Sequence, residues 1–163
     1  MELGILEKDG IYFPTISDFA KANLYYPHWG ATYVCDKPYE VIRAHHDSCI
    51  LFYILEGRLH FRYRDQYFCA KKDQIVILSG KFPNHYYATE QVHFNWFHFS
   101  GGATEEYVEL LYNMKGAIFT EETSLQAKAY VKEMMTFLKS NIGDEHIATL
   151  YIQGIFSLFE AEQ

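Results

Sequence analysis

The sequence predicts a mainly β, α+β fold: a small all-β barrel or sandwich followed by about three α-helices. From about Tyr33 to Phe99, short apolar or alternating runs are separated by turn residues, as in a chain of short strands. After Ser100-Gly101-Gly102 the apolar period changes from two to about 3.6, which indicates helices. Aromatic residues make up 18% of the chain, and such residues favour strands. The length of 163 residues fits one domain.

The strands are predicted from runs that end at turn residues. Cys49 to Leu55 is a nearly continuous apolar run that ends at Glu56-Gly57, and Arg58 to Tyr63 then alternates polar and apolar residues. These two segments therefore predict a hairpin. The further predicted strands are Tyr67 to Ala70, Gln74 to Leu78, His85 to Thr89 and Val92 to Phe99. Regular short strands at this spacing are typical of a sandwich or barrel.

The helices are predicted from apolar stripes and from residues that cap helices. Thr104 is the expected N-cap of the first helix, because Glu105 and Glu106 follow it at the positive end of the helix dipole, and Gly116 lies beyond the helix end. The second predicted helix spans Glu121 to Asn141 before Gly143, and the third begins after Asp144 and reaches Glu160.

The net charge of −7 argues against direct nucleic-acid binding by this chain, because such a surface needs a concentrated Lys/Arg patch. The nearest candidates are Arg58, Arg62, Arg64, Lys71 and Lys72. They alternate with aromatic residues along the predicted strands, so we expect them to mark the solvated face of a sheet.

The three cysteines, Cys35, Cys49 and Cys69, are odd in number and show no CxxC spacing. Neither a disulfide framework nor a zinc knuckle is predicted, and the expected compartment is the reducing cytoplasm. The N-terminus has no sustained apolar run, and no window of about 20 apolar residues exists, so neither a signal peptide nor a membrane span is expected.

Two polar clusters lie at predicted strand entrances. Arg43 to Asp47 precedes the buried strand, and Pro83 to Tyr87 precedes the aromatic strand. In a small barrel such positions lie at a mouth, where polar groups converge on a cavity that is otherwise apolar. The sequence therefore predicts a ligand site at this mouth.

The chain resembles the N-terminal domain of AraC-family transcription regulators over roughly Tyr39 to Gly102. The residues that carry the resemblance are Arg43, the DSCILFYILEGRLHF hairpin, the KDQIVIL strand, His85-Tyr86-Tyr87 and the Trp96 to Phe99 segment. The resemblance implies a cupin-like jelly-roll barrel over residues 1–103, which binds a small effector, commonly a sugar. It also implies a helical dimerisation region over residues 104–163.

In that family a C-terminal pair of helix-turn-helix motifs binds DNA, and this chain holds no such segment. Its last predicted helix breaks off at Glu160-Ala161-Glu162-Gln163 without a Gly or Pro stop. We expect a fragment cut before the DNA-binding domain, and the alternative is an ordinary charged C-terminus. We expect a homodimer through the helix from Glu121 to Asn141 or the helix from Asp144 to Glu160. The alternative is that all three helices pack on the barrel as core.

The site residues are carried over from the family by position. Arg43 would hydrogen-bond hydroxyls or a carboxylate, and Trp96 would offer a flat apolar face to a pyranose ring. Two structural alternatives stay open: Trp96 is core, or Arg43 forms an ion pair with Asp47 or Glu40. The full set of expected ligand-binding residues is Arg43, His85, Tyr87, Trp96, Trp29 and Thr32.

A cupin metalloenzyme, such as a sugar isomerase or dioxygenase, is the main alternative. When the metal motif of cupins is counted back from Gly57, its glutamate falls on Ile50 and its His-x-His pair falls on Arg43 and His45. Only His45 and His85 remain as ligands, and metal sites generally need three or four. We therefore expect no metal, no cofactor and no enzymatic activity. A stand-alone sugar-binding module is the third reading.

Overall fold

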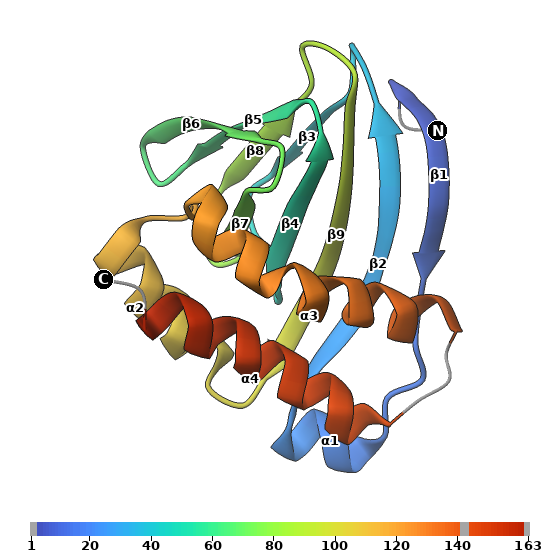
Figure 1. Ribbon diagram of the computed structural model, residues 1–163, viewed down its shortest axis with the longest axis vertical. Helices are drawn as coiled ribbons and strands as arrows, with labels where there is room; N and C mark the ends of the chain where they lie inside the picture. The colour runs from blue at the N-terminus through green and yellow to red at the C-terminus, as the bar shows by residue number, and fades with distance from the viewer. Residues whose placement is uncertain (1–2, 141–143, 162–163) are drawn as a thin grey trace.

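The computed structural model describes residues 3–140 and 144–161, whose strands form two antiparallel sheets that face each other (Figure 1). In order across the five-stranded sheet lie β1 (Ile5–Tyr12), β2 (Tyr25–Cys35), β9 (Val92–Gly101), β4 (Cys49–Glu56) and β7 (Ile75–Ser79). The four-stranded sheet has the order β3 (Glu40–Arg43), β8 (Asn84–Tyr87), β5 (Arg58–Tyr63) and β6 (Gln66–Lys71).

The strand order is that of a jelly roll. The order β2-β9-β4-β7 faces β3-β8-β5-β6, so the chain crosses repeatedly from one sheet to the other, and β1 extends the edge of the larger sheet. The predicted mainly β fold with a jelly-roll barrel is confirmed. Each strand predicted between Cys49 and Phe99 is present, with ends that differ by at most two residues.

Aromatic side chains fill the space between the two sheets. Phe52 of β4 contacts Phe61 and Tyr86 of the opposite sheet at ring-centroid distances of 5.0 and 4.9 Å. Alternation along each strand sends every second side chain inward, and in β9 the inward residues include Phe94 and Trp96. The high aromatic content of the sequence therefore lies largely inside the barrel.

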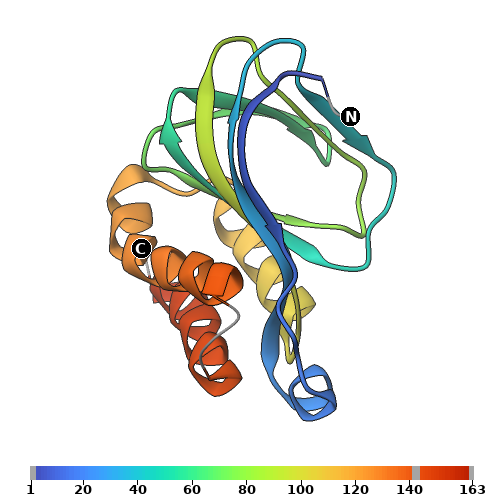
Figure 2. The ribbon, with the colours of Figure 1, turned by 90° about the vertical axis from the view of Figure 1, so that its right-hand side faces the viewer.

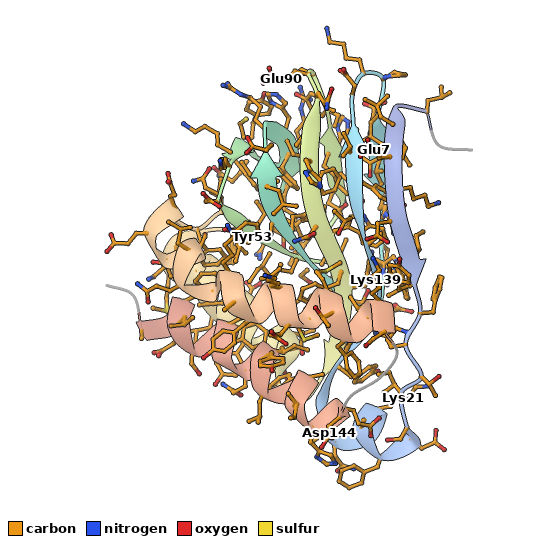
Figure 3. All side chains as sticks on the ribbon, turned by 45° about the vertical axis from the view of Figure 1, so that its right-hand side comes forward. Glu7, Lys21, Tyr53, Glu90, Lys139 and Asp144 are labelled. Atoms are coloured by element: carbon orange, nitrogen blue, oxygen red, sulfur yellow. The ribbon has the colours of Figure 1, made fainter. Side chains whose placement is uncertain are left out.

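The three predicted helices are present and pack on the outer face of the five-stranded sheet (Figure 2). They are α2 (Thr104–Lys115), α3 (Glu121–Ser140) and α4 (Glu145–Ala161). Phe119 stacks on Phe159 of α4 at 4.1 Å, and at the edge strand Lys139 Nζ lies 3.2 Å from Asp9 Oδ2 (Figure 3). No helix among the described residues is long and apolar enough to cross a membrane.

The apolar stripe of α3 is largely covered by the chain itself. Met134 and Leu138 lie on a helix that we expected as a possible dimer interface, and both are buried in the cluster between the helices and the sheet. Two large apolar side chains of α4, Ile147 and Leu150, remain exposed and lie one turn apart. The burial of α3 follows the alternative reading, in which the helix packs as core.

The first third of the chain holds more structure than the sequence predicted. Strands β1 and β3, most of β2 and the short helix α1 (Asp18–Asn23) were not predicted. Pro27 and Gly30 interrupt the β pattern, and the register of β2 shifts between Pro27 and Trp29, which is how a sheet tolerates a proline.

The N-cap of α2 lies one residue before the predicted one. Ala103, not Thr104, is the N-cap of α2, and Thr104 is the first helical residue, whose hydroxyl donates to the carbonyl oxygen of Gly101 at 2.6 Å. The prediction of Thr104 as cap was wrong by one position because Gly101-Gly102 turns the chain earlier. Asn141 and Gly143, predicted as the end of α3, lie outside the described residues.

Candidate functional site

Polar groups gather at one end of the barrel, opposite to the β8–β9 turn where Figure 3 labels Glu90. At this end β3 stops and β8 begins, and Asn84 lies in register between Arg43 of β3 and Tyr63 of β5. Asn84 and Tyr63 are buried, with side chains on the inner face of the sheet. Alternation along β3 places Arg43 on the same face as Val41, which packs against the interior.

The facing sheet contributes Trp96 and His98 of β9. His98 is fully buried, and its Nδ1 lies 2.8 Å from the hydroxyl of Ser48, which in turn lies 2.8 Å from His46 Nδ1. The ring of Trp29 stacks on His98 at a centroid distance of 4.5 Å. Trp29, Trp96 and His98 thus form an aromatic group at the same end of the barrel.

Burial keeps the imidazole of His98 uncharged. It lowers the pKa of His98 to about 2, and the positive charges of His46, Arg43 and His28 act in the same direction. Burial also lowers the pKa of His46, with the charge of Arg43 as the next cause. A neutral imidazole offers one donor and one acceptor, so His98 can bind either kind of group.

Four buried polar atoms at this end have no hydrogen-bond partner among the described residues: both amide atoms of Asn84, Trp96 Nε1 and His98 Nε2. Buried polar atoms in native proteins are nearly always paired, and an unpaired one costs about 1–3 kcal/mol. These side chains come from both sheets and share the interior. They mark this end of the barrel as the candidate site for a polar ligand.

Asn84 and His98 were not predicted as site residues. Asn84 stood in the polar cluster at a strand entrance, and His98 stood two residues after Trp96, which places both side chains on one face of a strand. In the sequence, a histidine among aromatics resembles an ordinary packed core residue, and only the missing partner at Nε2 distinguishes the two cases.

An open groove with a volume of about 1000 Å³ lies at this end of the barrel. It is lined by Ile42, Arg43, Ala44, Arg62, Tyr63, Arg64, Asp65, Gln66, Tyr67, Phe82, Pro83, Asn84, His85 and Tyr112. A smaller hollow of about 390 Å³ is lined by the following residues of the β3–β4 loop, from His45 to Ser48, together with His28 and Trp29. The cluster predicted from Arg43 to Asp47 therefore contributes to both hollows.

Arg64 closes one side of the groove. Its guanidinium lies between the rings of Phe82 and Tyr112, 3.9 and 4.1 Å from their centroids, and forms a bidentate pair with Glu109 of α2 at 2.7 and 3.2 Å. Hydrogen bonding to Glu109 is the main cause of its raised pKa. The sequence had assigned Arg64 to a solvated face, but its side chain is only 20% exposed because the β5–β6 turn packs against α2.

Of the predicted site residues, the structure brings Arg43, Trp96 and Trp29 together and separates His85 and Tyr87 from them. Alternation along β8 sends Asn84 and Tyr86 inward, so His85 and Tyr87 point to the outer face. His85 Nε2 lies 2.7 Å from Glu40 Oε2, and His85 reaches only the rim of the groove.

The structure also places Thr32 and the carboxylates considered as partners of Arg43. Thr32 lies on the helix-facing side of β2, where its hydroxyl donates to Asn95 Oδ1 at 2.7 Å, whereas its neighbours Ala31 and Tyr33 face the interior. The ion pairs considered for Arg43 are replaced by others among the described residues, since Glu40 pairs with His85 and Asp47 with His45.

In the part of the chain that the structure describes, no group of three or more His, Cys, Asp or Glu side chains could hold a metal ion. Burial raises the pKa of the Cys49 thiol, which lies 3.3 Å from Glu105 Oε1, so this thiol is a poor nucleophile.

A jelly-roll barrel with unpaired polar groups converging at one end is a ligand-binding domain in its architecture. The sequence matches the family model of the AraC-like ligand binding domain over residues 31–155, and the chain belongs to this family. The match spans the barrel from β2 onward and most of the helical region. A search of curated proteins finds no match to the chain.

Solved structures with a similar barrel include two regulators and an enzyme. The Cupin_2 domain of an XRE family transcriptional regulator from Enterobacter cloacae is 14% identical, with 53% of this chain and 88% of that chain covered and a TM-score of 0.43. An HTH_3 family transcriptional regulator from Vibrio cholerae is 14% identical, with 45% and 43% covered and a TM-score of 0.41.

The third is a predicted oxalate decarboxylase from Thermotoga maritima, 13% identical, with 45% of this chain and 66% of that chain covered and a TM-score of 0.39.

Proposed function

We propose that this chain is the effector-sensing part of an AraC-type transcription regulator in the bacterial cytoplasm, and that its effector is a sugar bound at the end of the barrel beside Arg43. The observation that carries the proposal is the set of buried, unpaired polar atoms on Asn84, Trp96 and His98. A ligand that pairs with these atoms offsets the cost of burying them without a partner.

The unpaired atoms suit a polyhydroxylated ligand. The amide of Asn84 donates and accepts, Trp96 Nε1 donates, and the neutral His98 does one or the other. Sugar hydroxyls also donate and accept, so one ligand can pair with all three side chains. The guanidinium of Arg43 adds charge-assisted hydrogen bonds from the opposite wall.

Sugar binding is tested by calorimetry on a panel of pentoses, hexoses and their acids. We expect at least one member to bind, and Arg43→Ala to weaken its affinity by about tenfold or more, as for the loss of a charge-assisted hydrogen bond. Thr32→Val, on the far face of β2, is the matched control and should bind normally. A ligand that binds the Arg43→Ala and wild-type proteins equally would show that the site lies elsewhere.

The proposed role is binding, not catalysis. Treatment with a chelator should therefore leave sugar binding unchanged, and elemental analysis of the purified protein should show no stoichiometric transition metal. A stoichiometric metal would favour the metalloenzyme alternative.

We further propose that the chain dimerises through its helical region and acts on DNA through a second domain. A twofold interface suits regulators that read paired DNA half-sites. Support comes from Ile147 and Leu150, which lie one turn apart on α4 and are 45% and 65% exposed. This patch replaces the buried face of α3 as the expected contact.

Sedimentation equilibrium at micromolar concentration should give a mass near twice 19.1 kDa. Leu150→Glu should yield a monomer, whereas Leu6→Glu on β1, at a similarly exposed position, should remain a dimer. A monomeric mass for the wild-type protein would contradict the dimer proposal and show that the helices serve only to pack on the barrel.

A further inference from the structure

Ser48 links two histidine rings at the end of the barrel. Its hydroxyl oxygen lies 2.8 Å from His46 Nδ1 and 2.8 Å from His98 Nδ1. The backbone N–H of Ser48 also donates to His46 Nδ1, at 3.3 Å. Ser48 and His98 are buried, so water does not compete freely for these hydrogen bonds.

These contacts fix which ring nitrogens carry a proton. The backbone N–H of Ser48 can only donate, so His46 Nδ1 is an acceptor and has no proton of its own. The hydroxyl of Ser48 must then donate its single proton to His46 Nδ1. His98 Nδ1 therefore carries the proton of the remaining contact and donates it to the Ser48 oxygen.

The state of the second nitrogen of His98 follows from the first. Burial, with the charge of His46 as the next cause, lowers the pKa of His98 to about 2, so the ring is neutral at pH 7 and carries one proton. Because that proton is on Nδ1, Nε2 is an acceptor. This atom is buried and has no hydrogen-bond partner in the described part of the chain.

A donor without a partner lies beside this acceptor. Trp96 Nε1 is likewise buried and unpaired, and an indole N–H can only donate. Trp96 and His98 are two residues apart on β9, so they share one face, and their rings lie edge to face at a centroid distance of 5.6 Å. A hydroxyl group can accept from the one and donate to the other.

We propose that His98 Nε2 is a fixed hydrogen-bond acceptor, and that this end of the barrel selects effectors with a hydroxyl group that donates to it and accepts from Trp96 Nε1. This inference rests on the proposed function and specifies it, because a carbonyl, ether or carboxylate oxygen at this point meets a lone pair.

The cost of accepting such a group follows from the same hydrogen bonds. A ligand that only accepts can be bound if His98 moves its proton to Nε2. The hydroxyl of Ser48 must then turn to His98 Nδ1, and its hydrogen bond to His46 is lost. The loss of one hydrogen bond corresponds to about tenfold in affinity.

The protonation of both rings is measured first, without a ligand, by ¹⁵N NMR of the histidine side chains at pH 7. We expect His98 Nδ1 and His46 Nε2 to be protonated, and the other nitrogen of each ring to be unprotonated. In Ser48→Ala, His98 should populate both tautomers. Ser79→Ala is the matched control, because this buried serine donates to Glu105 and should leave His98 unchanged. A proton on His98 Nε2 in the wild-type protein overturns the proposal.

Ligand selection is tested with isopropanol and acetone, which have the same shape, although only isopropanol has a donor. Isopropanol should shift the Nε2 resonance of His98, and acetone should need at least about a tenfold higher concentration for the same shift. In Ser48→Ala this difference should shrink, because the ring can then move its proton without the loss of a hydrogen bond. Equal responses to the two probes, or no response to either, overturn the proposal.

The two proposals fail differently. If His98 Nε2 is unprotonated and responds to isopropanol while no sugar of the panel binds, the acceptor stands and the sugar assignment is wrong. If a sugar binds with an affinity that depends on Arg43 while His98 Nε2 carries a proton, the sugar site stands and the fixed acceptor is wrong.

Discussion

Both faces of the four-stranded sheet carry polar and aromatic side chains, but they differ in hydrogen bonding. The polar groups compared here are paired on the outer face and unpaired on the inner face. On the outer face, both ring nitrogens of His60 have a hydrogen-bond partner. Its Nδ1 lies 2.9 Å from the hydroxyl of Tyr67, and its Nε2 lies 3.0 Å from the hydroxyl of Thr89. The ring of Tyr87 stacks on His60 at 5.1 Å. On the inner face, Asn84 keeps both amide atoms unpaired although it is buried.

This difference separates structural from ligand-directed polar groups. A polar cluster whose members satisfy one another gains nothing further from a ligand and serves to fix the sheet. A buried group without a partner lowers the stability of the fold, and natural proteins tolerate such groups mainly at functional sites. The predictions below test this distinction, from the largest expected effect to the smallest.

Replacing the unpaired amide should uncouple stability from binding. Asn84→Leu removes two unsatisfied atoms at similar volume, so we expect an unchanged or higher free energy of unfolding, by up to about 2 kcal/mol, and at least about a tenfold loss of effector affinity. Chemical denaturation and calorimetry measure the two quantities. A strong loss of stability would mean that Asn84 has a structural partner after all.

The buried imidazole should make the protein sensitive to acid. The folded-state pKa of His98 is about 2 and lies below the unfolded value of about 6.5, so stability is fully present above pH 6.5 and is lost as the pH falls. Between pH 7 and 5 the loss from His98 alone is about 2 kcal/mol.

Urea denaturation across this pH range measures the slope. His98→Gln should flatten it, while His45→Gln, at an exposed position, should leave it unchanged. A wild-type stability that is independent of pH in this window would contradict a neutral, buried His98.

Replacing His60 on the outer face should lower stability and leave effector affinity unchanged, the opposite of the result expected for Asn84. His60→Leu removes two hydrogen bonds and a stacked ring, so the free energy of unfolding should fall by about 1 kcal/mol, while effector affinity stays within about twofold of wild type. An affinity loss larger than the stability loss would place the outer face in the binding site.

The smallest effect is expected for the ion pair at the rim of the groove. Glu40→Gln weakens the contact with His85, and exposed pairs contribute about 0–1 kcal/mol, less at high salt. Denaturation at low and high ionic strength measures it. A larger, salt-independent loss would show that Glu40 has a further role.

The sequence predicted the strands from Cys49 to Phe99 well because their apolar runs and turn residues agree. It failed before Tyr33, where Pro27 and Gly30 break the β pattern and pairing with β9 and, from Gly30 onward, with β1 holds the strand in place. Long-range pairing of this kind leaves no local trace in the sequence.

The site was predicted in part for a similar reason. Arg43 and Trp96 were placed by their positions in the family pattern, and the structure puts both at the barrel end. His85 and Tyr87 lie outside the barrel because the pairing of β8 with β3 and β5 sends Asn84 and Tyr86 inward, and this register is set by the whole sheet. Which polar atoms lack partners depends on the whole fold and cannot be read from residue types.

The stacked, bidentate pairing of Arg64 ties the groove to the helices. Tyr112 and Glu109 belong to α2. The guanidinium of Arg64 therefore both lines the groove and holds α2 against the barrel. A rotation of α2 away from the barrel would break two charge-assisted hydrogen bonds and open one side of the groove at the same time. Any ligand that contacts this wall therefore favours one orientation of α2, and by thermodynamic reciprocity the orientation of α2 changes the affinity for the ligand.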